Sequence, residues 1–130
     1  MIIAYCFKRI ERGSPKLKAG IKMEILSSIQ DGVLCVKPSG DIDHHTAKDM
    51  REAIDGLIIK NNPRELALDL SAIDFMDSSG LGLVLGRYKK QLDIGGRFKI
   101  INPSRRIMQI LQLAGVEKII RIERANKNEK

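Results

Sequence analysis

The stretch that decides the fold is Leu66-Ala67-Leu68-Asp69-Leu70, followed two residues later by Ile73-Asp74-Phe75-Met76-Asp77-Ser78-Ser79-Gly80-Leu81-Gly82. The first five residues form a short apolar run, which is typical of a buried strand. The second run ends in a polar corner, and from Leu81 onward the apolar residues recur at helical spacing. The pattern predicts a strand, a loop and a helix, with two adjacent serines where the loop becomes the helix.

The serine corner has two interpretations. Aspartate and serine are favoured helix N-caps, and either Asp77 or Ser78 is accounted for as an ordinary cap. The alternative is a modification site, because the first N–H groups of a helix lack internal partners and the helix dipole there favours negative charge. The sequence around the corner shows no catalytic base, metal cluster or second nucleophile. It therefore predicts a serine that is acted upon, in a protein that is not an enzyme.

On both sides of this stretch the elements alternate. Strands are expected over 24–29, 33–37, 65–70, 97–101 and 118–122. Helices are expected over 46–60, over 79–92 and from about 105 to Gly115. This order, β-β-α-β-α-β-α with a short final strand, requires parallel pairing with helices against the sheet. We predict an α/β fold with a small mixed, mainly parallel sheet covered by helices.

Each helix is predicted to have one apolar face, and Cys35 is expected to be a small buried hydrophobe in its strand. The inward faces are predicted from spacings of three and four residues. They carry Ala47, Met50, Ile54, Leu57 and Ile58 in the first helix, Leu81, Val84, Leu85, Tyr88 and Leu92 in the second, and Ile107, Ile110, Leu111 and Ala114 in the third.

The 130 residues suffice for one domain, and the net charge of +7 is concentrated at the two ends of the chain. Residues 1–22 contain six basic residues against one acidic, and residues 121–130 contain four against two. Residues 23–120 contain 13 of each sign. A nucleic-acid-binding protein would place its basic surface on its folded elements, and nucleic acid is therefore not expected as a partner.

Residues 1–22 differ from the rest of the chain in charge and in the absence of a regular period. They are either an accessory arm or a non-native leader before a natural start at Met23, and the second explanation is favoured because the charge excess stops there. We expect a folded domain over 23–123 and a charged tail over 124–130. The apolar run at the start is too short for a signal peptide or a spanning helix, which predicts a soluble cytoplasmic protein without a membrane partner.

No metal or cofactor is expected. Cys6 and Cys35 form neither a CxxC motif nor a Cys/His ligand spacing. The two histidines, His44 and His45, are adjacent and cannot share one metal in the i, i+4 manner.

The histidines are expected to lie at a helix start, after a cap at Asp43. The alternative is that Asp41, Asp43 and His44 form part of a partner-contact surface. The loops 38–45 and 74–80 both follow strands, and in open α/β sheets that edge is where ligands and partners bind.

The glycines after the serine pair leave two accounts open. The spacing of Gly80, Gly82 and Gly86 matches neither nucleotide-binding glycine motif. Glycine inside a helix costs about 1 kcal/mol relative to alanine, which implies close packing on the sheet or close approach by a partner. Arg87, further along this helix, is either a partner contact or a solvent-facing residue, and the sequence favours solvent.

Three segments carry a family resemblance: Gly40-Asp41-Ile42-Asp43-His44-His45-Thr46-Ala47, then Phe75 to Gly82 with Leu85-Gly86-Arg87-Tyr88-Lys89, and finally Ile119-Ile120-Arg121. In this order, over residues 23 to about 123, the chain resembles the STAS family, the sulphate transporter and anti-sigma factor antagonist domains. Much of that family shares the Asp-Ser-Ser-Gly corner. The His-His-Thr and Gly-Arg-Tyr segments are similar to its sporulation branch.

The resemblance implies an anti-sigma factor antagonist with a STAS-like fold. Such a protein binds an anti-sigma factor that is also a serine kinase, which carries ATP or ADP, and thereby frees the sporulation sigma factor. The kinase is expected to phosphorylate Ser78, and a PP2C-type phosphatase to reverse this. The free protein is expected to be a monomer, and its expected partner-binding residues are Asp41, Asp43, His44, Asp77, Ser79, Gly80, Leu81, Gly82 and Arg87.

Two alternatives accompany this hypothesis. One is an antagonist that serves a stress-response sigma factor, which differs only in the identity of its partner. The other is a nucleotide-binding protein that uses the corner at Gly80 and Gly82. This second alternative lacks the phosphate-loop lysine, the phosphate-loop spacing and a recognisable base.

Overall fold

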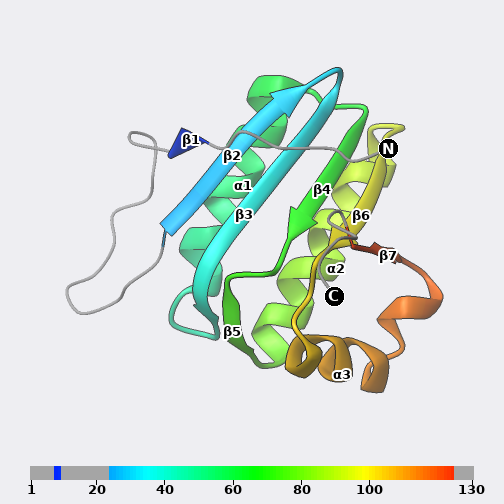
Figure 1. The fold of residues 1–130 in the computed structure, drawn as a ribbon. Helices are drawn as coiled ribbons and strands as arrows, with labels where there is room; N and C mark the ends of the chain where they lie inside the picture. Colours follow the sequence, from blue (N-terminus) through cyan, green and yellow to red (C-terminus); the bar gives the residue numbers. More distant parts are fainter. Residues whose placement is uncertain (1–7, 10–23, 125–130) are drawn as a thin grey trace.

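The computed structural model describes residues 8–9 and 24–124 (Figure 1). Its strands are β1 (Lys8–Arg9), β2 (Glu24–Gln30), β3 (Val33–Ile42), β4 (Glu65–Asp69), β5 (Ile73–Met76), β6 (Arg97–Ile101) and β7 (Arg121–Glu123). Its helices are α1 (Ala47–Asn61), α2 (Ser78–Asp93) and α3 (Arg105–Leu113), with the 3-10 turn η1 (Val116–Lys118).

The strands form one mixed sheet in the order β1-β2-β3-β4-β6-β7, and β5 pairs with the end of β3. The pairs β1/β2 and β2/β3 are antiparallel, whereas β3/β4, β3/β5, β4/β6 and β6/β7 are parallel. Figure 1 shows the three helices on one face of this sheet. The predicted α/β fold, with its mainly parallel sheet and covering helices, is confirmed.

The strands place alternate side chains on opposite faces of the sheet. Leu34 and Val36 join the large core between the sheet and the helices. Cys35 lies between them in sequence and packs on the opposite face against Ala67 and Ile101. Its side chain is 0% exposed, which confirms the prediction of a small buried hydrophobe. Burial also raises the pKa of the Cys35 thiol to about 12.

The predicted helix faces are correct for α1 and only partly correct for the other two helices. In α1, Met50, Ile54 and Ile58 are buried, and Ala47 and Leu57 pack against the core.

In α2, Leu85 and Leu92 are exposed, contrary to the prediction, and Leu83 is buried instead. The buried stripe of this helix includes Arg87 and Gln91, and two polar residues on the inner face concealed its position from an apolar period. In α3, Ala114 is exposed, contrary to the prediction, and it follows the last helical residue, Leu113, as the C-cap.

Two strands also differ from prediction by more than one residue at a boundary. β3 continues through Pro38 and Gly40 to Ile42, although the sequence predicts a strand over 33–37. β3 pairs with β4 from Val33 to Val36 and with β5 from Gly40 to Ile42, and the register against β5 shifts between Gly40 and Asp41. β5 is a strand that the sequence analysis missed. The last strand starts at Arg121 because residues 116–118 form a 3-10 turn before it.

Most of the leader and the tail lies outside the described residues. Of residues 1–22 only Lys8–Arg9 is described, paired with Ser27 and Leu26 of β2. The expectations for Cys6 and for residues 125–130 concern parts that are not described. Within the described part of the chain, no helix has the length and apolar character needed to cross a membrane.

Candidate functional site

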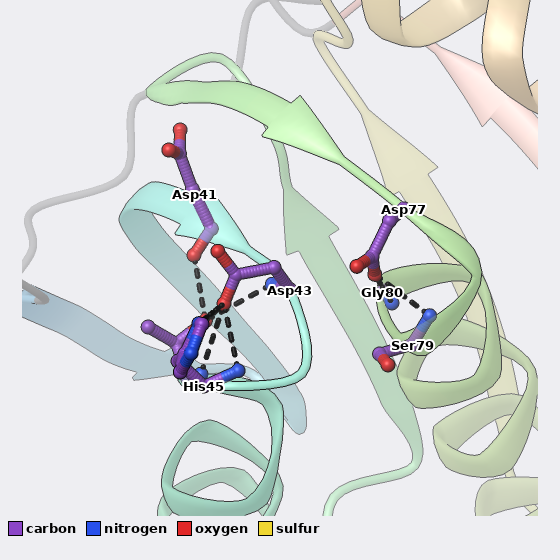
Figure 2. Close-up of polar contacts among 7 residues, drawn as sticks. Asp41, Asp43, His45, Asp77, Ser79 and Gly80 are labelled. Atoms are coloured by element: carbon purple, nitrogen blue, oxygen red, sulfur yellow. Dashed lines mark hydrogen bonds and ion pairs between the residues drawn. The ribbon is translucent and has the colours of Figure 1, made fainter.

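Two helix-start turns lie side by side at one edge of the sheet, because the strands that lead into them are parallel neighbours. Ile42 of β3 is in register with Met76 of β5. The N–H of Asp77, the residue after Met76, donates to the Ile42 carbonyl oxygen at 3.2 Å. β3 then runs into the turn before α1, and β5 runs directly into α2 (Figure 2). We call residues 41–46 and 77–82 together the two-turn surface.

In the second turn, Asp77 is the N-cap of α2. Its Oδ1 accepts hydrogen bonds from the N–H groups of Ser79, at 2.8 Å, and Gly80, at 3.3 Å (Figure 2). The cap interpretation is therefore confirmed for Asp77. Ser78 is the first residue of the helix and is exposed, whereas Ser79 is half-buried. Of the two hydroxyls, that of Ser78 belongs to the more accessible residue.

In the first turn, Asp43 and Thr46 form reciprocal hydrogen bonds. Asp43 Oδ1 accepts from the N–H of His45 at 2.8 Å and from that of Thr46 at 3.2 Å. Thr46 Oγ1 accepts from the Asp43 N–H at 3.1 Å and donates to the Asp41 carbonyl oxygen at 2.7 Å. The hydrogen bond from the His45 N–H is the main cause that lowers the pKa of the Asp43 carboxyl.

Thr46 is a site residue that the sequence analysis missed. It is 6% exposed and occupies the N-cap position of α1, which begins at Ala47. The helix thus starts one residue later than predicted. The three-residue spacing of Asp43 and Thr46, typical of a reciprocal cap, was the available signal.

The two histidines are exposed beside the first turn. The ring centroids of His44 and His45 are 3.9 Å apart, and the ring planes are inclined at 39°. His45 Nδ1 lies 3.7 Å from Asp43 Oδ1. The described residues contain no group of three His, Cys, Asp or Glu side chains placed to hold a metal ion.

The glycines of α2 have different surroundings. A Cβ on Gly80 would collide with the Met76 side chain and would lie 2.9 Å from the Ile42 carbonyl oxygen. Packing of helix on strand therefore accounts for Gly80, which is buried. A Cβ on Gly82 or Gly86 would have no neighbour within 4 Å. Packing within the described structure does not explain these two glycines.

Two other predicted site residues lie inside the fold. Leu81 is half-buried and packs against the core. Arg87 is only 5% exposed, and the solvent-facing interpretation is wrong. Its Nε lies 2.8 Å from Asp55 Oδ1 on α1. Burial lowers the pKa of Arg87, and the charge of Asp55 opposes that shift.

The exposed parts of the two-turn surface are small and polar. Asp41, His44, Ser78 and Gly82 are exposed, and Asp43, Asp77 and Ser79 are half-buried. The structure thus brings most of the predicted site residues together on one surface. Two of them are buried, Gly80 within the second turn and Arg87 further along α2.

The sequence and the fold were compared with those of known proteins. Residues 24–128 match the family model described as STAS domain. The chain is similar to the anti-sigma F factor antagonist of Paenibacillus polymyxa, with 38% identity over 91 residues, which are 70% of this chain and 78% of the relative. It is also similar to the anti-sigma-B factor antagonist of Bacillus subtilis (strain 168), with 31% identity over 87 residues, which are 67% of this chain and 78% of the relative.

A solved structure with a similar fold is that of the Bacillus cell fate determinant SpoIIAA in its phosphorylated form. The TM-score is 0.62 at 26% sequence identity, and the match covers 81% of this chain and 94% of that chain. With the sheet order, the capped serine corner and the matched family model, the conclusion is that this chain belongs to the STAS-domain family and has anti-sigma factor antagonists among its relatives.

Proposed function

We propose that this protein is an anti-sigma factor antagonist that acts in the cytoplasm as a monomer, and that phosphorylation of Ser78 switches it off. The observation that carries the proposal is the position of Ser78, which is exposed at the first residue of a capped helix, beside a second polar turn. The partner is an anti-sigma factor that covers the two-turn surface. The names of the relatives support the same class of partner.

The switch works through charge. A phosphate adds about −1.5 to −2 charges. At many helix starts, free N–H groups would donate hydrogen bonds to the phosphate. Here the N–H groups of Ser79 and Gly80 already donate to the carboxylate of Asp77. The phosphate would therefore add to the carboxylate of Asp77 inside the contact. Repulsion and desolvation of an unpaired interfacial charge cost about 2–5 kcal/mol, enough to dissociate the complex without a change in fold.

The kinase and phosphatase steps are part of the proposal. The anti-sigma factor is itself a serine kinase, and it transfers the γ-phosphoryl group of ATP to Ser78 Oγ and releases ADP. A PP2C-type phosphatase hydrolyses the phosphoserine and restores the hydroxyl with release of phosphate. The phosphorylated SpoIIAA structure, which has a similar fold, supports a phosphorylated form.

The sigma factor is proposed to be the one for sporulation, because the relative that is 38% identical is an anti-sigma F factor antagonist. A stress-response sigma factor is the second candidate, which the anti-sigma-B factor antagonist of Bacillus subtilis supports. The nucleotide hypothesis loses its basis. Gly80 is used in packing, and the first N–H groups of α2 bind Asp77.

The test is the intact mass of the protein after incubation with ATP and the anti-sigma factor of the same organism, with peptide mapping. We expect one phosphoryl group on Ser78, no gain in mass for Ser78→Ala, and an unaltered gain for Ser79→Ala. Ser78→Ala should still bind the anti-sigma factor, and Ser78→Asp should bind it weakly. A phosphoryl group found on Ser79 alone would refute the assignment of Ser78.

A further inference from the structure

We propose that Arg87 positions the two-turn surface from beneath, through its buried ion pair with Asp55, and does not itself contact the partner. This inference rests on the proposed function, because it concerns how the same surface is held. Arg87 lies four residues after Leu83 and four before Gln91, and both of these residues are buried. The charged side chain thus belongs to the inward face of α2.

The environment of Arg87 is unusual for a charged group. Its Nε lies 2.8 Å from Asp55 Oδ1, and its side chain is 7% exposed against 23% for that of Asp55. Among the ion pairs of the described residues, this pair is the one that joins α1 to α2. A buried ion pair contributes little net stability, because the desolvation of both charges offsets their attraction. The pair brings one atom of α1 and one atom of α2 into contact, and it thereby fixes the distance between the two helices at that point.

The position of the pair along the two helices relates it to the two-turn surface. Thr46, at the start of α1, is nine residues before Asp55, and Ser78, at the start of α2, is nine residues before Arg87. At a rise of 1.5 Å per residue, the pair lies about 13 Å from each helix start. The bond from the Asp77 N–H to the Ile42 carbonyl oxygen already joins the two turns at their bases. Both helices also pack in the same hydrophobic core, and the ion pair adds a polar link between them about 13 Å from the one at their starts, which restricts their relative direction further.

The test compares Arg87→Met, Asp55→Leu and the double variant, for stability and for affinity to the anti-sigma factor. Asp55→Leu leaves the buried charge of Arg87 unpaired and Arg87→Met leaves the half-buried charge of Asp55 unpaired, so both are expected to be less stable, Asp55→Leu the more so. The double variant replaces the pair with apolar side chains and is expected to regain the stability of the parent protein. At matched stability, we expect its affinity to remain at least ten-fold lower. A double variant that binds as tightly as the parent overturns the proposal.

The matched control removes a different partly buried ion pair. Lys99 Nζ lies 3.3 Å from Glu123 Oε1, between β6 and β7, and joins neither helix. The double variant Lys99→Met with Glu123→Leu should therefore leave the affinity unchanged. Should the apolar double variant at positions 55 and 87 not fold, Arg87→Lys is measured in its place, because lysine keeps the charge and lacks the planar guanidinium.

A second measurement does not depend on the partner. Nitroxide labels at His45→Cys and Ser78→Cys, both exposed positions, report the separation of the two turns by electron paramagnetic resonance. Cys6→Ser removes the other cysteine of the chain, and Cys35 stays unlabelled because burial raises the pKa of its thiol to about 12. We expect a broader distance distribution in the apolar double variant. An unchanged distribution overturns the positioning role, whereas failure of the parent protein to bind any anti-sigma factor refutes the proposed function alone.

Discussion

The two turns of the two-turn surface lie side by side, but different contacts hold them in place. The first turn is held by side chains within it, since Asp43 and Thr46 exchange hydrogen bonds and Thr46 also binds the Asp41 carbonyl oxygen. The second is held by the Asp77 cap and by the close contact of Gly80 with Ile42. The first turn therefore depends on a buried hydroxyl, and the second on the absence of a side chain. In both, the supporting residue is buried and the residues left for a partner are exposed.

The largest expected effect separates the two kinds of glycine in α2. Gly80→Ala should destabilise the protein by about 2–3 kcal/mol, because the added Cβ meets the Ile42 carbonyl oxygen and overpacks the contact. Gly82→Ala should stabilise it by up to about 1 kcal/mol, since alanine favours the helix and the added Cβ meets nothing within 4 Å. Urea denaturation of both variants measures the difference. Equal effects from the two substitutions would show that Gly80 is not a packing residue.

Gly82→Ala also tests the outward face of α2. If a partner approaches this position closely, the more stable variant should bind the anti-sigma factor less tightly than the parent protein. Titration calorimetry measures both affinities. An unchanged affinity would show that the partner does not come near Gly82.

The first turn should be broken by removal of one hydroxyl. Thr46→Val is expected to cost about 1–2 kcal/mol, because it leaves the Asp43 N–H and the Asp41 carbonyl oxygen without this partner. Thr46→Ser keeps the hydroxyl and is the control. Thermal unfolding of the two variants gives the comparison, and a Thr46→Val protein as stable as the parent would show that the hydrogen bonds of the hydroxyl do not matter at this position.

The cap of the second turn should have a smaller effect on stability. Asp77→Ala is expected to cost about 1 kcal/mol through the loss of the N-cap. Asp77→Asn should retain most of that stability, because asparagine is a comparably good cap. It also removes a negative charge beside Ser78, and the phosphorylated Asn variant should accordingly retain more affinity for the anti-sigma factor than the phosphorylated parent. Identical affinities would exclude a contribution of Asp77 to the switch.

The smallest effect concerns pH and the first turn. The pKa of Asp43 is lowered in the folded protein, chiefly by the hydrogen bond from the His45 N–H. The stabilisation that follows is therefore present above the ordinary pKa of an aspartate and is lost as the pH falls through the lowered value. Asp43→Asn should show a weaker loss of stability on acidification than the parent protein. Denaturation midpoints measured from about pH 6 to about pH 3 test this, because that range includes the ordinary aspartate pKa of about 3.9.

Much of the fold was predictable from local sequence. Hydrophobic periods of two and three to four residues placed the central strands, all three helices and the inward face of α1, since these periods report directly which side of an element is buried. The apolar pattern also predicted that Cys35 is buried, and cap preferences offered Asp77 or Ser78 as the cap of the helix at the serine corner. Each of these features depends on residues within a few positions of one another.

The sequence by itself determined the three helices, the central strands and the serine corner with a cap at Asp77 or Ser78, because short-range periodicity and capping chemistry are sufficient for them. Only the tertiary structure decided the pairing of β5 with β3, the collision that requires glycine at position 80 and the burial of Arg87 against Asp55. In these the contacting residues come from elements far apart in sequence, where no local period indicates the contact. The same limit explains why Gly80 and Gly82 could not be distinguished from the sequence, although one supports the surface and the other is exposed on it.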